Sequence, residues 1–126
     1  MKKNIKKTIK NIRINILKKT FEAKSSHIGS CYSIVEILCA LYFSKLKKKD
    51  TFILSKGHAA LALYCTLFEK NFFRKSLLDT YGKNGTKLMA HASHKVKGVE
   101  FSTGSLGHGL PYAVGKALGE KINKTN

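Results

Sequence analysis

The hydrophobic positions along the chain predict several helices. Residues 5–24 place isoleucine, leucine and phenylalanine at helical spacing, with lysine and asparagine between them, which is typical of an amphipathic helix. Residues 25–30 break this period and indicate a loop. Residues 33–45 are mostly apolar and predict a helix that is buried on most sides. Residues 59–73 predict another apolar helix, so the front of the chain is expected to be rich in helices.

One short segment has the character of a strand. Residues 51–55 form an apolar run between a lysine-rich connection and a glycine, which favours a buried parallel strand. Residues 76–81 predict one or two further helical turns. A last helix is expected from Pro111 to about Lys121, because proline suits the first turn of a helix. Strand and helices together predict an α/β fold.

Composition allows one domain and leaves the class of partner open. The chain has 126 residues, with 24 Lys and Arg against 7 Asp and Glu, which gives a formal net charge of +17. All the basic residues except Arg13 and Arg74 are lysines, whereas specific recognition of nucleic acid usually relies on arginine. A solvated lysine surface is therefore favoured over a specific nucleic-acid site. A small lysine-rich nucleic-acid-binding protein remains the alternative of a different class.

Targeting and redox signals are weak. No apolar run approaches the roughly 18 residues that are needed to span a bilayer, so we expect no membrane partner. The lysine-rich N-terminus lacks the apolar core of a secretory signal. Cys31, Cys39 and Cys65 form no C-x-x-C pair and are interpreted as small buried hydrophobic residues. A cytoplasmic location is expected.

Three segments that join histidine to glycine are the candidates for chemistry. They are residues 26–29, residues 55–58 at the junction of the predicted strand and helix, and residues 104–109 before the last helix. Ligands of α/β proteins bind where strands end and helices begin, and glycine allows the main chain to approach a phosphate closely. Each segment alone is a weak signal. The segment from Gly82 to Gly109 that contains the third of them is a long loop, and such loops are often functional or mobile.

Two other features were weighed as sites. His91 and His94 have the spacing of a metal pair, but no third ligand is evident and we do not predict a zinc site. Glu36 lies in an apolar predicted helix and is a candidate functional acid. No catalytic triad or carboxylate pair can be assembled from the sequence.

Taken in order, residues 26–29, 52–58 and 98–109 resemble the amino-terminal part of transketolase, and especially the split form in which two separate chains make the enzyme. The likeness covers about residues 8–121. It implies the front portion of a three-layer thiamine diphosphate-binding fold. It also implies transfer of a two-carbon ketol unit between sugar phosphates. An enzyme similar to deoxyxylulose-phosphate synthase is the alternative within the same superfamily.

The resemblance also implies roles for individual residues. His58 matches the histidine that binds the cofactor diphosphate, and Gly104, Ser105 and Leu106 match the loop that lines the cofactor. His27 and His91 match catalytic histidines on the substrate side. His94 is the less favoured candidate for the second of these positions.

Departures from the family pattern set further expectations. Ser26 stands where the family commonly has glycine, and Ile28 where it commonly has proline. The family's magnesium motif is expected beyond residue 126, so residues 1–126 are expected to be an incomplete portion of the domain that is inactive alone.

Thiamine diphosphate and Mg²⁺ are the cofactors that the resemblance implies. The implied partners are sugar phosphates and a carboxy-terminal transketolase chain or domain, in a homo- or hetero-oligomer.

Overall fold

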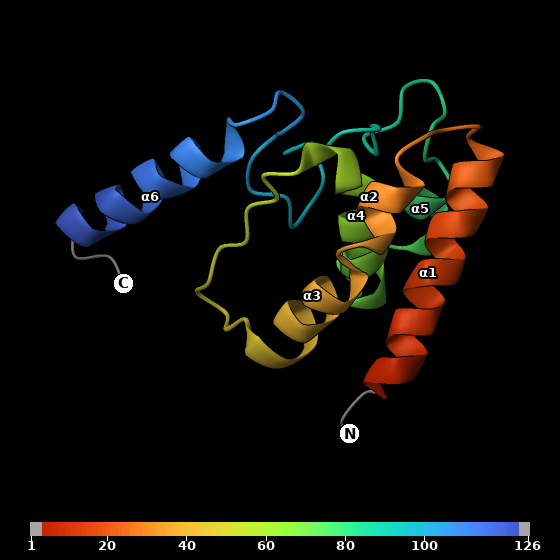
Figure 1. The fold of residues 1–126 in the computed structure, drawn as a ribbon, viewed down its shortest axis with the longest axis horizontal. Coiled ribbons are helices and arrows are strands. Elements are labelled where there is room, and N and C mark those ends of the chain that lie inside the picture. The colour runs from red at the N-terminus through yellow and green to blue at the C-terminus, as the bar shows by residue number, and fades with distance from the viewer. Residues whose placement is uncertain (1–3, 124–126) are drawn as a thin grey trace.

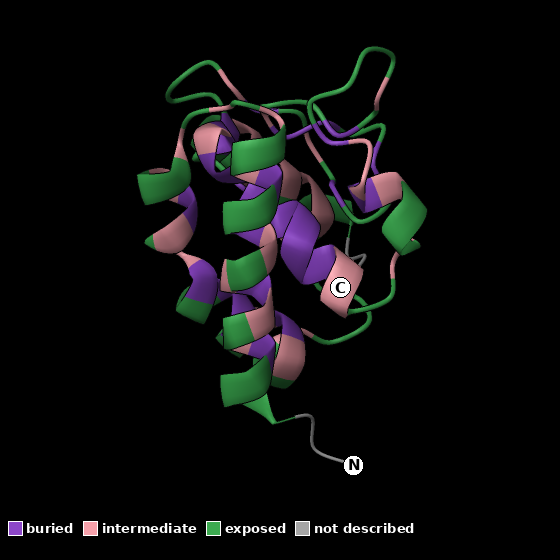
Figure 2. Cartoon of the chain, turned by 90° about the vertical axis from the view of Figure 1, so that its right-hand side faces the viewer, coloured by how far each residue is buried: buried purple, intermediate pink, exposed green. Residues whose placement is uncertain are grey.

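Helices α1 (Ile5–Glu22) and α4 (Ala60–Glu69) pack against each other and form the centre of the core (Figure 1). The computed structural model describes residues 4–123. Ile12 and Ile16 of α1 are fully buried, while most lysines of this helix face solvent, as its amphipathic pattern predicts. Buried residues gather where the helices face one another (Figure 2). The predicted helix over residues 5–24 is thus confirmed, and it ends at Glu22.

The single helix predicted over residues 33–45 is wrong in its bounds. The chain forms α2 (Ile28–Tyr32), α3 (Val35–Ala40) and the π-helical turn η1 (Leu41–Lys45). The Ser33 hydroxyl donates to the carbonyl of Ser30 at 2.9 Å, and this local bond competes with a continuous helical ladder. The loop predicted at residues 25–30 is correspondingly shorter, because α2 begins at Ile28.

The stretch Ile28–Lys45 is long and apolar enough to cross a membrane by length and composition. This corrects the expectation that no run approaches that length. The stretch is broken at residues 33–34, and its residues Cys31, Val35 and Leu38 are buried among the other helices. A buried core segment can have the same length and hydropathy, so these two properties are weak evidence for a membrane span.

The predicted strand at residues 51–55 is not formed, and the described part of the chain contains no strand. A strand requires a neighbour that completes its ladder of main-chain hydrogen bonds. No neighbouring segment among residues 4–123 provides one, and the carbonyl of Leu54 accepts instead from the side chain of Thr103 at 2.6 Å. The three-layer α/β fold is therefore not confirmed.

The second half of the chain follows the predicted order with shorter helices. A 3-10 turn, η2 (Gly57–Ala59), leads into α4, which ends at Glu69 rather than at residue 73. Asn71 adopts a left-handed conformation with φ of 61°, which an α-helix cannot continue through. The short helix α5 (Lys75–Leu78) then precedes the long glycine-rich loop that the sequence predicts.

The last helix, α6 (Gly109–Asn123), points away from the other helices (Figure 1). It begins earlier than predicted and is held near its start, where the rings of Tyr112 and Phe101 stack at 3.9 Å. Gly109 is its one residue buried among those described. The remainder of α6 is exposed or half-buried and has little contact with the core.

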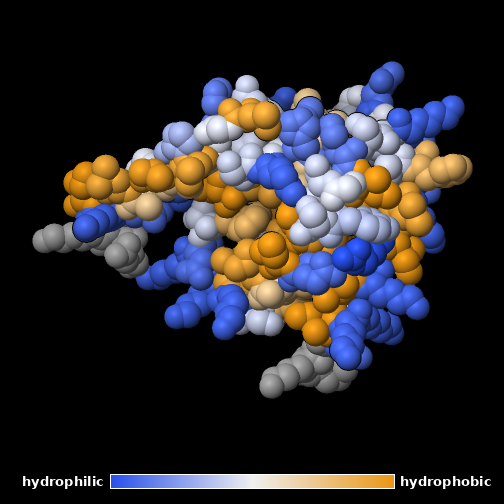
Figure 3. All heavy atoms as spheres, in the orientation of Figure 1, coloured by the Kyte–Doolittle hydropathy of each residue, from blue (hydrophilic) through white to orange (hydrophobic). Residues whose placement is uncertain are grey.

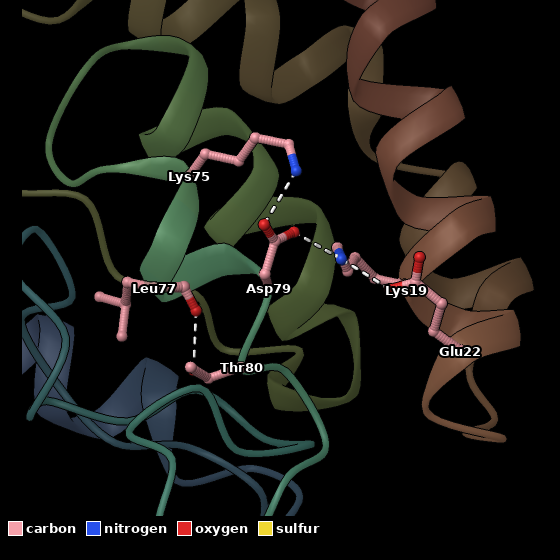
Figure 4. Close-up of polar contacts among 6 residues, drawn as sticks. All are labelled: Lys19, Glu22, Lys75, Leu77, Asp79 and Thr80. Atoms are coloured by element: carbon pink, nitrogen blue, oxygen red, sulfur yellow. Dashed lines mark hydrogen bonds and ion pairs between the residues drawn. The ribbon is translucent and has the colours of Figure 1, made fainter.

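A partly buried ion-pair network joins α1 to α5 (Figure 4). Lys19, only 8% exposed, contacts Asp79 at 2.7 Å and Glu22 at 2.6 Å. Lys75 contacts the other oxygen of Asp79 at 2.8 Å. The amphipathic pattern gave no sign of this contact, since Lys19 was expected to face solvent like the other lysines of the helix.

All three cysteines are free and buried, as expected for small hydrophobic residues. Burial raises the pKa of each thiol, to about 11 for Cys39. The thiols are therefore protonated at neutral pH and have little nucleophilic character.

Candidate functional site

Three histidines from distant parts of the chain meet at one place. His27 lies just before α2, His58 lies in the turn η2 before α4, and His91 lies in the loop between α5 and α6. Their ring centroids are separated by 4.7 Å for His27 and His58, 4.7 Å for His58 and His91, and 5.8 Å for His27 and His91. We call these three residues the histidine cluster. His27 and His58 come from two of the three candidate segments, and His91 comes from the long loop.

The main chain of each histidine is fixed from outside the cluster. His27 has a φ of 72°, and its carbonyl accepts the amide of Cys31 at 3.0 Å in the first turn of α2. The Cys31 thiol lies 3.9 Å from the carbonyl of His58, within the long range of a weak sulfur hydrogen bond. These contacts tie the first two histidines to the same short helix.

Tyr64 holds the third histidine and was not identified from the sequence. Its hydroxyl, on the fully buried side chain, donates to the carbonyl of His91 at 2.8 Å and accepts the amide of Ser93 at 3.2 Å. Burial raises the pKa of this hydroxyl well above its usual value, so it remains a donor. The signal available in the sequence was a tyrosine in an otherwise apolar helix, since a buried hydroxyl needs a partner.

Glycines allow the long loop to approach the turn before α4. A Cβ on Gly57 would overlap the carbonyl of Thr103, and a Cβ on Gly109 would lie 2.5 Å from the Cα of Ser55. A Cβ on Gly104 would lie 3.3 Å from the ring of His91. The amide of Thr103 also donates to the carbonyl of Ala92 at 3.1 Å. The glycine-rich loop is thus in direct contact with the segments that carry the cluster.

The predicted loop residues differ in how close they lie to the cluster. Gly104 is against His91, whereas Ser105 and Leu106 are exposed beyond it, Leu106 by 78%. His94 is exposed and its Nδ1 lies 2.7 Å from the hydroxyl of Ser102, which also accepts the amide of His94 at 2.9 Å. His91, His94 and Gly104 line one shallow hollow of about 390 Å³.

Electrostatics favour neutral imidazole at His91. Burial lowers its pKa, and the neighbouring rings of His58 and His27 lower it further because two positive charges so close repel. A bound anion would reverse the second effect. The amine of Lys56, in the turn that precedes His58, donates to the Ser33 hydroxyl at 2.8 Å.

The candidate acid Glu36 lies outside the histidine cluster. Glu36 forms an ion pair with Arg13 at 2.7 Å, and its hydrogen bond to that guanidinium lowers the pKa of the carboxyl. Both side chains are largely solvent-accessible, so Glu36 is engaged in a surface contact rather than in the cluster. Among residues 4–123, no group of three or more His, Cys, Asp or Glu side chains is arranged to hold a metal ion.

The chemistry of the cluster fits a diphosphate group. Three imidazoles offer ring nitrogens that can donate to phosphate oxygens, and Gly104 beside His91 leaves space that a side chain would fill. The residues present therefore suit the phosphate end of a cofactor such as thiamine diphosphate.

Comparisons with known proteins agree with this geometry. Residues 4–126 match the family described as transketolase, thiamine diphosphate binding domain. The chain is 38% identical over 123 residues to one of the subunits of the apulose-4-phosphate transketolase from Phocaeicola vulgatus, which covers 90% of this chain and 44% of that protein. It is 40% identical over 107 residues to the 6-deoxy-6-sulfo-D-fructose transketolase subunit SqwG of a Clostridium species, covering 77% of this chain and 39% of the relative.

A full-length enzyme is also similar. Human transketolase is 36% identical over 122 residues, which cover 90% of this chain and 20% of the human protein. The chain therefore spans less than half the length of each of these relatives. Because the family match extends over residues 4–126, the chain belongs to the transketolase family and contains sequence of its amino-terminal, thiamine diphosphate-binding domain.

Proposed function

We propose that the chain takes part in transfer of a two-carbon ketol unit from a ketose phosphate to an aldose phosphate, with thiamine diphosphate as cofactor. The observation that carries the proposal is the meeting of His27, His58 and His91 beside the glycine-rich loop. The relatives named above are transketolases, which favours this reaction over that of a deoxyxylulose-phosphate synthase.

In this proposal the residues divide between cofactor and substrate. His58 donates to a terminal oxygen of the diphosphate, and the main chain of Gly104, Ser105 and Leu106 lines the cofactor. The bound cofactor supplies the thiazolium ring at which the carbon–carbon bond chemistry takes place. His27 and His91 donate to hydroxyl and carbonyl oxygens of the sugar, and neutral His91 is suited to accept a proton from one of those hydroxyls.

The proposal includes a partner. Two of the relatives are named as subunits of a transketolase, so we assign a second chain that completes the enzyme. Mg²⁺ belongs to the proposal as the counter-ion of the diphosphate, with ligands that come from outside the described residues. By the same reasoning residues 1–126 alone bind the cofactor weakly and do not catalyse.

Calorimetric titration tests the cofactor assignment. Thiamine diphosphate is expected to bind the chain at least tenfold more tightly than thiamine, because only the former carries the diphosphate. His58→Ala should abolish most of this difference, since a hydrogen bond to a charged group contributes about 1.5–3 kcal/mol. His108→Ala is the matched control, because His108 is exposed and lies outside the cluster. Equal affinities for both ligands would contradict the assignment.

The substrate role of His27 is tested in the completed enzyme. We expect His27→Asn to lower kcat by roughly 10²–10⁴-fold while thiamine diphosphate still binds. Asparagine is chosen because it tolerates the left-handed conformation that His27 adopts. A variant with full kcat would remove His27 from the proposed chemistry.

A further inference from the structure

His94 lies beside the histidine cluster and has no part in the chemistry proposed above. Its side chain is exposed, and it shares with His91 and Gly104 the hollow of about 390 Å³. Its Nδ1 lies 2.7 Å from the hydroxyl oxygen of Ser102, whereas its Nε2 has no hydrogen-bond partner among residues 4–123. The ring is therefore held at one nitrogen and open at the other.

The hydroxyl of Ser102 selects one tautomer of His94. The hydroxyl oxygen accepts the amide of His94 at 2.9 Å, and the proton of the same hydroxyl is available to Nδ1. A neutral imidazole carries one proton, so a ring that accepts at Nδ1 carries its N–H at Nε2. The pair of His94 and Ser102 thus offers a neutral hydrogen-bond donor on the open side of the ring.

Buried contacts fix the loop that carries this pair, although the pair itself is exposed. Ser93 and Thr103, which are each 5% exposed, are the chain neighbours of His94 and Ser102. The amide of Ser93 donates to the hydroxyl of Tyr64 at 3.2 Å, and the hydroxyl of Thr103 donates to a main-chain carbonyl at 2.6 Å. Exposed side chains on a rigidly held loop are suited to binding, because little conformational entropy is lost when a ligand arrives.

The lining of the hollow suits an uncharged chain that carries hydroxyl groups. Met89 contributes apolar surface, while His91, His94 and Ser102 contribute hydrogen-bonding groups. Lys95 is the one Lys, Arg, Asp or Glu in the lining among the described residues. Sugars present C–H groups together with hydroxyl oxygens, so they can use both kinds of wall. A neutral donor at Nε2 suits a hydroxyl oxygen, since a phosphate is bound more strongly by a charged ring.

The exposed face of the helix that follows the loop is apolar by contrast. Figure 3 shows apolar residues running along α6, and Leu110, Val114 and Leu118 are each more than half exposed. Such side chains cannot donate to a hydroxyl oxygen. The hydrogen-bonding groups that extend the histidine cluster therefore come from the loop rather than from this face of α6.

We propose that His94 and Ser102 form a subsite for a hydroxyl group of the sugar substrate beyond the two carbons that are transferred. The Nε2–H of His94 donates to the sugar oxygen, and Ser102 orients the ring. This inference rests on the proposed function, in which His91 contacts the reacting end of the sugar. Because His91 and His94 line the same hollow, the carbons that are not transferred occupy its His94 side. His94 is then a specificity-determining residue.

The test compares two donors in the completed enzyme. D-xylulose 5-phosphate carries hydroxyls beyond the transferred carbons, whereas hydroxypyruvate carries the same two-carbon unit and no hydroxyl beyond it. We expect His94→Ala to raise KM for D-xylulose 5-phosphate about fivefold to tenfold with kcat unchanged, because a hydrogen bond to bound substrate is lost. KM for hydroxypyruvate should stay the same. His94→Gln, whose side-chain amide keeps a donor, should restore KM to within about twofold of the unmodified enzyme.

A matched control and a spectroscopic readout separate binding from damage to the loop. Lys97→Ala should change KM for neither donor, because Lys97 is exposed in the same loop and lies outside the lining. The nitrogen chemical shifts of His94 in the chain should report a proton at Nε2. Ser102→Ala should give a mixture of both tautomers. The inference is overturned if His94→Ala raises KM for both donors alike or for neither, or if the proton lies at Nδ1.

Titration of the chain with D-xylulose distinguishes this inference from the proposed function. The sugar lacks the phosphate, so its effect on the ring reports the hydroxyls alone, and we expect the resonance of His94 to shift in the unmodified chain. Should the completed enzyme transfer no ketol unit from either donor, the proposed function fails. The sugar titration then decides the subsite: a shift at His94 supports it, and an unmoved resonance overturns it.

Discussion

At the scale of single residues, glycines allow the close contacts that surround the histidine cluster. The loop that carries Gly104 reaches His91 because glycine stands at positions where any Cβ would meet main-chain or ring atoms. Thr103 adds two hydrogen bonds, from its hydroxyl to Leu54 and from its amide to Ala92. The sequence predicts that glycines in this loop let the main chain approach a phosphate closely, and in the fold they permit close contact with the neighbouring segments.

Gly57→Ala is expected to destabilise the protein by roughly 1–3 kcal/mol, because its Cβ would overlap the carbonyl of Thr103. Gly29→Ala is the matched control. A Cβ at Gly29 meets nothing within 4 Å, and alanine suits a helix better than glycine, so stability should be unchanged or slightly higher. Urea unfolding measures both variants. Equal stability of the two would show that the loop does not rest against Gly57.

His91 is expected to titrate below the usual histidine pKa of about 6.5. Burial and the two neighbouring rings lower its pKa in the folded protein, so the unfolded chain binds the proton more readily. The free energy of unfolding should therefore fall as the pH drops below about 6.5, until His91 is protonated in both states. In His91→Gln this part of the pH dependence should disappear. Imidazole NMR titration checks the pKa directly, and a value at or above 6.5 would refute the expectation.

At the scale of elements, the contact between α1 and α5 is held by a charge that the helical pattern did not reveal. Burial lowers the pKa of Lys19, but its hydrogen bonds to Asp79 and Glu22 outweigh this effect and the net pKa is raised. Those same bonds lower the pKa of Asp79, so its contribution to stability is lost as the pH falls through the acid range.

Asp79→Asn is expected to lower stability by about 1–2 kcal/mol, because it leaves the nearly buried ammonium of Lys19 without its main partner. Lys19→Met should be milder, since methionine keeps the apolar stem and removes the charge. Lys75→Met provides the control, because Lys75 is 73% exposed and its pair with Asp79 should contribute little. Thermal unfolding compares the stabilities of the three variants. A larger loss of stability for Lys75→Met than for Asp79→Asn would contradict this prediction.

The elements also show where prediction from the sequence succeeds and where it fails. Periodicity located α1, α4 and α6, because each has apolar residues at a consistent helical spacing. It did not find the break at residues 33–34, because both sides of the break are equally apolar. The run at residues 51–55 has the composition of a strand and its alternation of faces, yet strand formation depends on a neighbour that residues 4–123 do not supply.

At the scale of the whole molecule, the order of three short motifs was more informative than any of them alone. The sequence placed His27, His58 and His91 as candidates, and the fold brings their rings within 4.7–5.8 Å of one another. The sequence analysis did not identify the role of Tyr64, because the partner of its buried hydroxyl lies 27 residues away along the chain.

An NMR titration of the five histidine rings with inorganic pyrophosphate tests the diphosphate site most directly. We expect the resonance of His58, which binds the anion, to shift most. Those of His27 and His91, whose ring centroids each lie 4.7 Å from that of His58, should shift with the same apparent Kd, and the pKa of His91 should rise as the anion is added. Those of His94 and His108 should change little. Shifts that are equal at all five rings, or a resonance of His58 that does not move, would contradict the assignment of the diphosphate to His58.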